Sequence, residues 1–246
     1  MIDVGTESGD IVARPNVRHT SQRRREAAGT GLFDRKDVAT IVIAKRLDYE
    51  GKTKTAKYTE NALLRSGKDE VRAPTIVIRE PEAGKRQLNA TGGVASILHQ
   101  TPKDASKPPT PVDTKSEEMI YEEALGQIVY TGNVVIHQGD VQTKSPKATL
   151  TLTADQSRLQ KLVAGEPVDV DQGARHATGR VGTYTPDDQT MVLVGEKVVL
   201  KDPSQQVEGR EVTFHTGDDR ILVDGQEQVR TQAVFKTEKP PELPKQ

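Results

Sequence analysis

The chain has 246 residues, with 35 Lys and Arg against 36 Asp and Glu, so its formal net charge is −1. This balance argues against an electrostatic nucleic-acid binder, which carries a basic excess. The absence of cysteine excludes disulfides, thiolate metal sites and cysteine nucleophiles. Apolar residues make up only 33% of the chain, which favours a thin or elongated fold over a large globular core.

Valine, threonine and isoleucine number 26, 25 and 11, a quarter of the chain. These β-branched side chains fit a pleated sheet better than a helix. The 20 glycines and 14 prolines are spread along the chain, which is typical of turns between many short strands. The sequence therefore predicts an all-β protein of roughly 15–20 strands with little helix. The best helical candidate is the stretch 116–125, whose glutamates also suit a short turn.

Strands and turns alternate regularly in the first half of the chain. Residues 100–116 carry four prolines together with Lys, Ser and Asp, which predicts an inserted polar loop. The N-terminus (MIDVGTESGD) lacks the basic start and apolar stretch of a signal peptide. Upstream of the insert the sequence predicts four strands, at residues 38–49, 55–65, 70–78 and 87–98.

The chain also repeats itself. Residues 49–78 align with residues 121–150 without a gap, and a third copy begins at Tyr184. Regular repetition indicates an array of one supersecondary unit. The aligned identities are Tyr49/Tyr121, Glu50/Glu122, Tyr58/Tyr130, Thr59/Thr131, Asn61/Asn133, Gly67/Gly139 and Pro74/Pro146. A closing signature of an aliphatic residue, a small residue and Val recurs at Leu88/Ala90/Val94, Leu162/Ala164/Val168, Val223/Gly225/Val229 and Ile11/Ala13/Val17.

These repeats predict how the chain is divided. Because Ile11, Ala13 and Val17 have no complete unit before them, we expect the chain to begin inside a repeat. The Pro- and Lys-rich end predicts a disordered tail. The expected divisions are an N-terminal segment 1–36 with the closing strand of an upstream repeat, repeats 37–99, 118–175 and 176–237, a polar Pro-rich insert 100–117, and the tail 238–246.

The run 130–139 (YTGNVVIHQG) resembles the characteristic hairpin of the OstA-like family, the periplasmic lipopolysaccharide-transport proteins of the LptA type. Residues 58–67 (YTENALLRSG) and 193–200 (LVGEKVVL) are similar to the same hairpin. The resemblance covers roughly residues 37–235. Other runs that resemble this family are 71–78 (VRAPTIVI), 162–170 (LVAGEPVDV) and 207–223 (VEGREVTFHTGDDRILV).

This resemblance implies an elongated antiparallel β-jellyroll, a folded-over sheet that is open at both ends. Its interior is expected to be an apolar trough that shields the acyl chains of lipopolysaccharide in the periplasm. The resemblance also implies OstA-fold partners of the inner and outer membranes, and head-to-tail association. No cofactor and no nucleic-acid partner are expected.

Side-chain alternation along the strands predicts which residues line the trough. Ile128, Tyr130, Val134 and Ile136 share one parity, which is more apolar than the other and is therefore placed inside. Equivalent positions in the other strands extend this set. The predicted lining residues are Tyr58, Ala62, Leu64, Ile76, Ile78, Tyr130, Val134, Ile136, Leu150, Leu193, Val198, Leu200, Val212 and Phe214, to which Ala148 is added by the same parity.

The sequence offers little chemistry. It has no GxSxG nucleophile elbow, and none of its histidines pairs at a metal-ligand spacing. Asp187/Asp188 and Asp218/Asp219 lie in turn-like contexts, and Asp169/Asp171 is a third acidic pair. We therefore expect neither an enzyme nor a metal site. The five histidines are His19, His99, His137, His176 and His215.

Three classes of function remain after these exclusions. The leading hypothesis is a lipopolysaccharide carrier or bridge module. The alternative is a structural β-repeat scaffold with a dry core and no ligand, and a repeat-sheet carbohydrate enzyme is third. A carrier needs a continuous apolar slot, a scaffold fills its interior with packed side chains, and an enzyme needs clustered acids on one sheet face.

Overall fold

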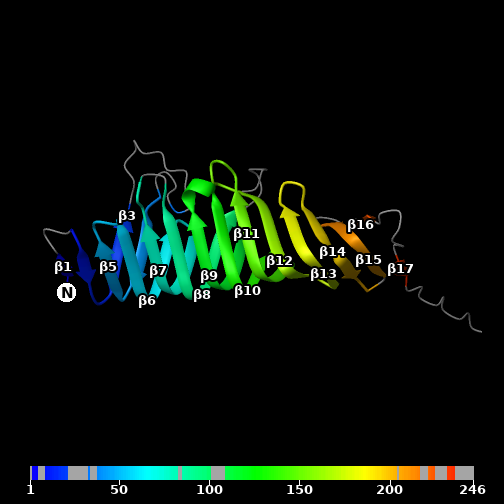
Figure 1. Ribbon diagram of the computed structural model, residues 1–246, viewed down its shortest axis with the longest axis horizontal. Helices are drawn as coiled ribbons and strands as arrows, with labels where there is room; N and C mark the ends of the chain where they lie inside the picture. Colours follow the sequence, from blue (N-terminus) through cyan, green and yellow to red (C-terminus); the bar gives the residue numbers. More distant parts are fainter. Residues whose placement is uncertain are drawn as a thin grey trace, which may run out of the picture.

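The computed structural model describes residues 2–4, 9–21, 33, 38–82, 85–100, 109–203, 205–216, 221–224 and 232–235. Within these residues, seventeen β-strands form one sheet, and the 3-10 turn η1 (Glu123–Leu125) interrupts it once. All the strand pairs are antiparallel. The molecule is elongated, and its strands follow one another along the long axis in chain order (Figure 1). The predicted all-β jellyroll is confirmed.

The strands are grouped here by the three repeats that the sequence predicts, after a short N-terminal group. The N-terminal strands are β1 (Ile2–Val4), β2 (Ile11–Ala13) and β3 (Val17–Ser21). The first repeat contains β4 (Thr40–Ala44), β5 (Arg46–Glu50), β6 (Thr55–Ser66), β7 (Asp69–Arg79) and β8 (Gln87–Gln100). The second contains β9 (Thr110–Glu122), β10 (Gln127–Gln138), β11 (Val141–Leu152) and β12 (Leu159–Gln172). The third contains β13 (Arg175–Thr185), β14 (Thr190–Lys201), β15 (Gln205–His215), β16 (Ile221–Asp224) and β17 (Gln232–Phe235).

Each repeat is joined to the strand before it in the same way. In the first repeat, β4 and β5 act as one broken strand, because both pair with β6. The N-terminal strands β3 and β2 pair with β4 and β5, as β8 pairs with β9. At the other end, β16 and β17 both pair with β15.

The pairing of every long strand is interrupted near its middle. The pairing register shifts between Thr59 and Ala62 in β6 and between Thr131 and Val134 in β10. Such bulges bend strands and increase their twist. Repeated from strand to strand, they form one line of bends along the molecule, here called the crease.

The crease folds the sheet into two walls. Wall 1 contains the strand halves with Tyr58 and Tyr130, and wall 2 contains the halves with Leu64 and Ile136. In β6 the inward positions stay buried on both sides of the bend, while Glu60 at the bend is exposed. A hydrogen bond of 2.8 Å between Ser96 Oγ and Tyr130 Oη joins the two walls. The core therefore lies between the walls.

Several repeated identities in the sequence are explained by the bends and turns. Asn61 and Asn133 lie at the crease with φ of 66° and 46°, a region that asparagine tolerates better than most residues. Gly67 and Gly139 begin two-residue hairpin loops with φ of 62°, the pattern of type II′ turns. Proline at the crease, as at Pro74, removes no ladder hydrogen bond because pairing is already interrupted there.

One sequence prediction in the middle of the chain is wrong, since residues 110–117 belong to β9 and not to a polar insert. The best helical candidate, 116–125, is strand up to Glu122 and ends in the short turn η1, in keeping with the all-β prediction. The physical reason for the wrong prediction is that β9 turns Thr114 and Ser116 inward, where both are buried. Polar inward positions hide the alternation that marks a strand. Residues 101–108 of the insert and the tail 238–246 lie outside the described residues.

The crease makes a direct prediction about stability. Gly132 has φ of 80°, and a Cβ there would lie 2.7 Å from Glu117 Cβ. Gly139 also has positive φ, but a Cβ there meets no atom within 4 Å. Gly139→Ala should lower the free energy of unfolding by about 1 kcal/mol, because alanine is strained at positive φ. We expect Gly132→Ala to cost at least about 1 kcal/mol more, because β9 must move. Urea denaturation measures the free energy of unfolding of both variants. Equal losses of stability would contradict the close packing of β9 against Gly132 at the crease.

Candidate functional site

The interior between the walls is lined by continuous rows of register partners. In wall 1 one row runs across seven adjacent strands, from β6 to β12, and every member is buried. The row consists of Tyr58, Ile76, Ala90, Met119, Tyr130, Ala148 and Ala164. Because these residues are uncharged and mostly apolar, the interior presents a hydrocarbon-like surface along the molecule.

The predicted lining residues lie on this interior face. Ile78 is partly buried, and the other predicted lining residues are buried. Tyr58, Tyr130 and Leu193 come from wall 1, whereas Leu64, Ile136 and Leu200 come from wall 2. The alternation rule therefore placed each of them inside.

The sequence analysis missed the interior residues of the first and fourth strands of each repeat. Leu88, Met119, Tyr121 and Leu162 are all buried in the core. Alternation in β8 carries the signal that would have found them, since Leu88, Ala90 and Val94 are buried between exposed neighbours. Phe33 is also buried and packs edge-on against Tyr121, with ring centroids 5.4 Å apart.

Interior tyrosines use their hydroxyl groups to bind partners near the ends of the strands. Tyr121 donates to Gln156 Oε1 at 2.5 Å, and Tyr58 bonds the ring of His19. Burial raises the pKa of Tyr130 to about 12. These groups are neutral at physiological pH, so they add hydrogen bonds to the interior without adding charge.

The walls approach each other again on the side opposite the crease, here called the mouth. Gln172 Nε2 at the end of β12 donates to the carbonyl of Thr216 at 3.0 Å, after β15, and so joins the two walls. Two clefts open between the walls at the mouth. One of 190 Å³ includes Ile136 and Met191. The other, of 360 Å³, lies at the N-terminal end of the interior and includes Val42 and Tyr58.

A wider hollow of 610 Å³ lies along the crease instead of the mouth. Arg72 and Lys115, which are exposed, belong to its lining. Buried Ala73 and Val94 also belong to it. The mouth clefts, by contrast, lie between the strand ends of the two walls, and the 360 Å³ cleft reaches Tyr58 of the interior row.

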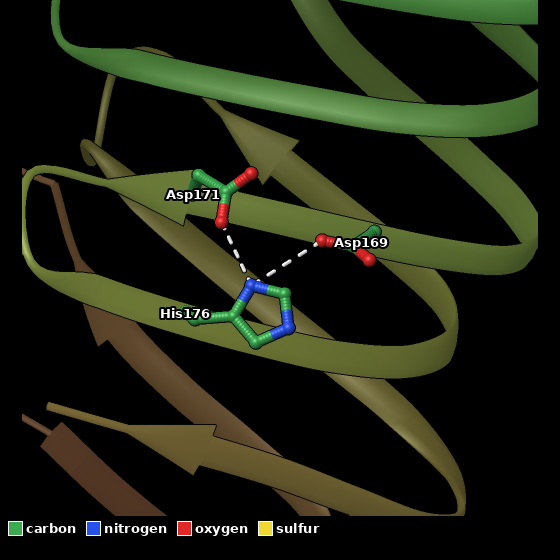
Figure 2. A group of neighbouring side chains, drawn as sticks. All are labelled: Asp169, Asp171 and His176. Atoms are coloured by element: carbon green, nitrogen blue, oxygen red, sulfur yellow. Dashed lines mark hydrogen bonds and ion pairs between the residues drawn. The ribbon is translucent and has the colours of Figure 1, made fainter.

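Charged side chains gather on the outer face of wall 2. Asp169 and Asp171 on β12 lie beside His176 on β13 (Figure 2). His176 Nδ1 lies 2.7 Å from Asp171 Oδ1 and 3.4 Å from Asp169 Oδ1. Sequence spacing hid this group, because it is the two-residue loop after β12 that sets Asp171 opposite His176.

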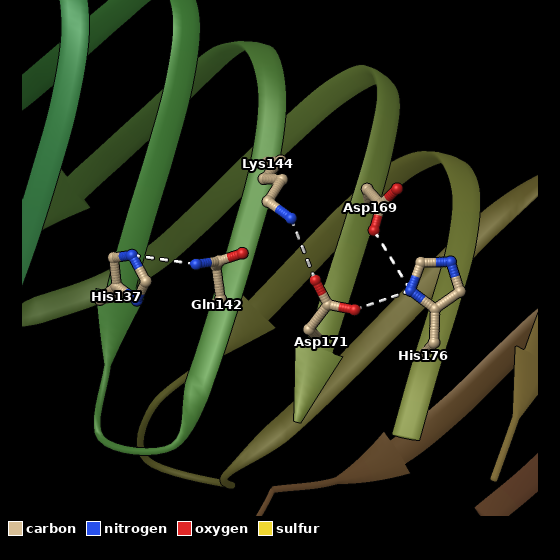
Figure 3. Close-up of polar contacts among 6 residues, drawn as sticks. All are labelled: His137, Gln142, Lys144, Asp169, Asp171 and His176. Carbon is tan, nitrogen blue, oxygen red and sulfur yellow. Dashed lines mark hydrogen bonds and ion pairs between the residues drawn. The ribbon is translucent and has the colours of Figure 1, made fainter. Parts of the chain in front are cut away.

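The group continues across the sheet as an ion-pair network (Figure 3). Lys144 Nζ lies 3.3 Å from Asp171 Oδ2, and Gln142 contacts His137 at 3.0 Å. The nitrogen of His176 and the carboxylates of Asp169 and Asp171 also form a donor set that suits a transition-metal cation. Their ligand atoms lie within 4.8 Å of one another. Lys144 already balances Asp171, so the arrangement serves first as cross-strand charge pairing.

These observations define the class of molecule: an elongated, folded-over antiparallel sheet with an apolar interior and with clefts between the strand ends of its two walls. No helix among the described residues has the length and apolar character that crossing a membrane requires.

Residues 112–220 match the family model described as LptA/(LptD N-terminal domain) LPS transport protein. The match confirms the resemblance to the OstA-like lipopolysaccharide-transport family for this part of the chain. An uncharacterized protein of Rhizobium meliloti (strain 1021) is 26% identical over 99 residues, which cover 37% of this chain and 53% of that protein. The chain thus spans about half the length of this curated relative.

A solved structure is also similar, that of LptH, the LptA homologous periplasmic component of the lipopolysaccharide transport device from Pseudomonas aeruginosa. It is 18% identical, with a TM-score of 0.46, and the similarity covers 55% of this chain and all of that one.

The outer network predicts a measurable titration. Hydrogen bonding to His176 is the largest cause that lowers the pKa of Asp171, and the hydrogen bond from Lys144 adds to it. A carboxyl group whose pKa is lowered by folding stabilises the fold at pH values above its unfolded-state pKa. This stabilisation is lost as the pH falls through the folded-state pKa. His176→Ala should therefore raise the pKa of Asp171, as measured by carboxyl NMR titration.

Asp155 provides the control for this titration. Its pKa of about 2 is caused mainly by hydrogen bonds from Thr153 and Ser157. It should not respond to His176→Ala. An unchanged pKa of Asp171 in the His176→Ala variant would show that His176 does not lower that pKa.

Proposed function

We propose that this protein is a periplasmic carrier or bridge module that binds lipopolysaccharide during transport to the outer membrane. Its two walls would hold the acyl chains between them. The single observation that carries this proposal is the continuous apolar row of the interior, which spans wall 1 from β6 to β12. The matching family of transport proteins supports it. We propose no enzymatic activity.

Burial of hydrocarbon supplies enough free energy for such binding. Each acyl CH₂ removed from water contributes about 0.8 kcal/mol, so several methylenes suffice without a polar anchor. An interior of medium-sized aliphatic residues also binds without strict geometry. Weak specificity suits a carrier, because the cargo must leave again.

The close packing of the interior favours one alternative, a structural scaffold with a dry core. Leu193, Val198 and Leu200 are 0% exposed, so acyl chains enter only if the walls move apart. The walls would separate at the mouth, where the hydrogen bond of Gln172 to Thr216 would have to break. Opening at the mouth leaves the crease intact, as a hinge.

Partners of the same fold would extend the interior at the two ends of the sheet. Among the described residues, β3 pairs with β4 alone, and β16 and β17 pair with β15 alone. Strand edges of this kind bind further strands. We propose head-to-tail association, with another copy or with OstA-fold components of the inner and outer membranes, which would make the lipid path continuous.

Photo-crosslinking tests the interior directly. A photo-reactive residue at position 136 should label lipopolysaccharide, whereas one at position 135, on the opposite face of β10, should not. Leu64→Asp should reduce lipid binding at least tenfold, because an unpaired carboxylate would face the acyl chains. Arg65→Asp, of opposite parity, is the matched control and should retain binding.

The outcomes separate the carrier from the scaffold. Equal labelling at positions 135 and 136 would reject the assigned face. No labelling at either position, with the protein folded by circular dichroism, would favour the scaffold with a dry core.

Association is tested by light scattering over a range of concentrations. We expect the mean mass to rise with concentration, and to rise less when residues 1–20 are deleted, because the deletion removes β1, β2 and most of β3. A protein that stays monomeric at all concentrations, with or without these residues, would contradict association through the strand edges.

A further inference from the structure

The N-terminal end of the interior differs in chemistry from the rest. The 360 Å³ cleft there, here called the end cleft, has an apolar base formed by Val42 of wall 2 and Ala56 and Ile78 of wall 1. The charged side chains of Lys54, Glu80 and Arg86 also line it. Its volume lies at the lower end of the range for small-molecule sites. An apolar base beside charged groups suits an amphiphile.

Arg86 is the unusual residue of the end cleft, because its charge is almost completely buried. It is 8% exposed, and its Nη2 donates to Glu80 Oε2 at 2.9 Å. A guanidinium presents five donors in a planar fork, so it can bind a carboxylate of the protein and a ligand anion together. Burial also keeps its field less screened than that of a surface lysine.

The backbone holds Arg86 firmly in place. Its N–H donates to Glu123 Oε2 at 3.1 Å, and its carbonyl accepts from the N–H of Glu123 at 2.9 Å. Glu123 is itself 5% exposed. The start of β8 is therefore fixed to η1 from both sides, which orients the arginine before any ligand arrives.

Among the described residues that line the end cleft, the cations Lys54 and Arg86 stand beside one carboxylate, that of Glu80. His19, whose ring stacks on Tyr58 with centroids 6.0 Å apart, also lines the cleft. Burial and, second, the charge of Arg86 lower the pKa of His19, so the positive field of Arg86 reaches into the cleft.

We propose that the end cleft is a head-group subsite for anionic amphiphiles. A phosphate or carboxylate head group binds Arg86 and Lys54, and the attached hydrocarbon chain lies on Val42, Ala56 and Ile78. The inference rests on the proposed function, and it adds a site that recognises the charged head group of the lipid. The interior would then have a defined starting point for loading.

Calorimetric titration with three probes tests this subsite. Dodecyl phosphate and dodecyl maltoside share one chain and differ in head-group charge, and inorganic phosphate has no chain. We expect the wild-type protein to bind dodecyl phosphate about tenfold tighter than dodecyl maltoside, the factor of one charged hydrogen bond. Inorganic phosphate alone should bind at least tenfold more weakly than dodecyl phosphate.

Variants assign the preference to the named residues. Arg86→Met and Lys54→Met should each bring the affinity ratio of the two amphiphiles towards one. Glu80→Gln should keep or increase the ratio. Lys85→Met is the matched control, since Lys85 is exposed, carries the same charge and pairs with Glu82 at 2.8 Å outside the cleft. Lys54 is exposed, so its variant remains informative if Arg86→Met does not fold.

The outcomes distinguish this subsite from the proposed function. Equal affinity for both amphiphiles, or a ratio that Lys54→Met and Arg86→Met leave unchanged, would overturn the subsite while leaving apolar binding in place. Inorganic phosphate binding as tightly as dodecyl phosphate would also overturn it. Binding of neither amphiphile would overturn both proposals.

Discussion

The crease is the constraint on which the rest of the structure depends. Side chains alternate along a strand with a period of two, so a strand that bends from one wall to the other must keep the same face inside. In β6 the buried positions Tyr58 and Ala62 lie four residues apart, so the same parity faces inward on both sides of the bend. In β7 the buried positions Ala73 and Ile76 lie three residues apart, so the bulge shifts the phase by one residue and keeps the apolar side of both halves inside.

This geometry explains how a chain with few apolar residues builds a core. Each strand contributes inward residues to both walls, so one strand of about twelve residues covers two surfaces. The outer faces are then free to carry charge pairs, which contribute little to stability when exposed to salt and water. The apolar contacts between the walls stabilise the protein, and under the proposed function the same surface would bind the acyl chains.

Position in the fold decides what a charged group can do here. The network of Asp169, Asp171 and His176 lies half-exposed on the outer face, where solvent screens its charges. Arg86 lies almost fully buried at the end of the interior, where its charge is screened less than at the surface. This difference is the reason why the head-group subsite is proposed at Arg86 and not at the outer network.

The sequence by itself determined the all-β class, the repeats, and the inward face of strands such as β10, because alternation and glycine turns are local properties of the chain. Tertiary structure alone decided three features. It placed Thr114 and Ser116 inside, where the opposite wall supplies Tyr130 as a polar neighbour. It brought His176 to two aspartates through strand pairing. It buried Arg86 beside an apolar cleft. Each depends on contacts between strands or walls, which residue spacing along the chain does not encode.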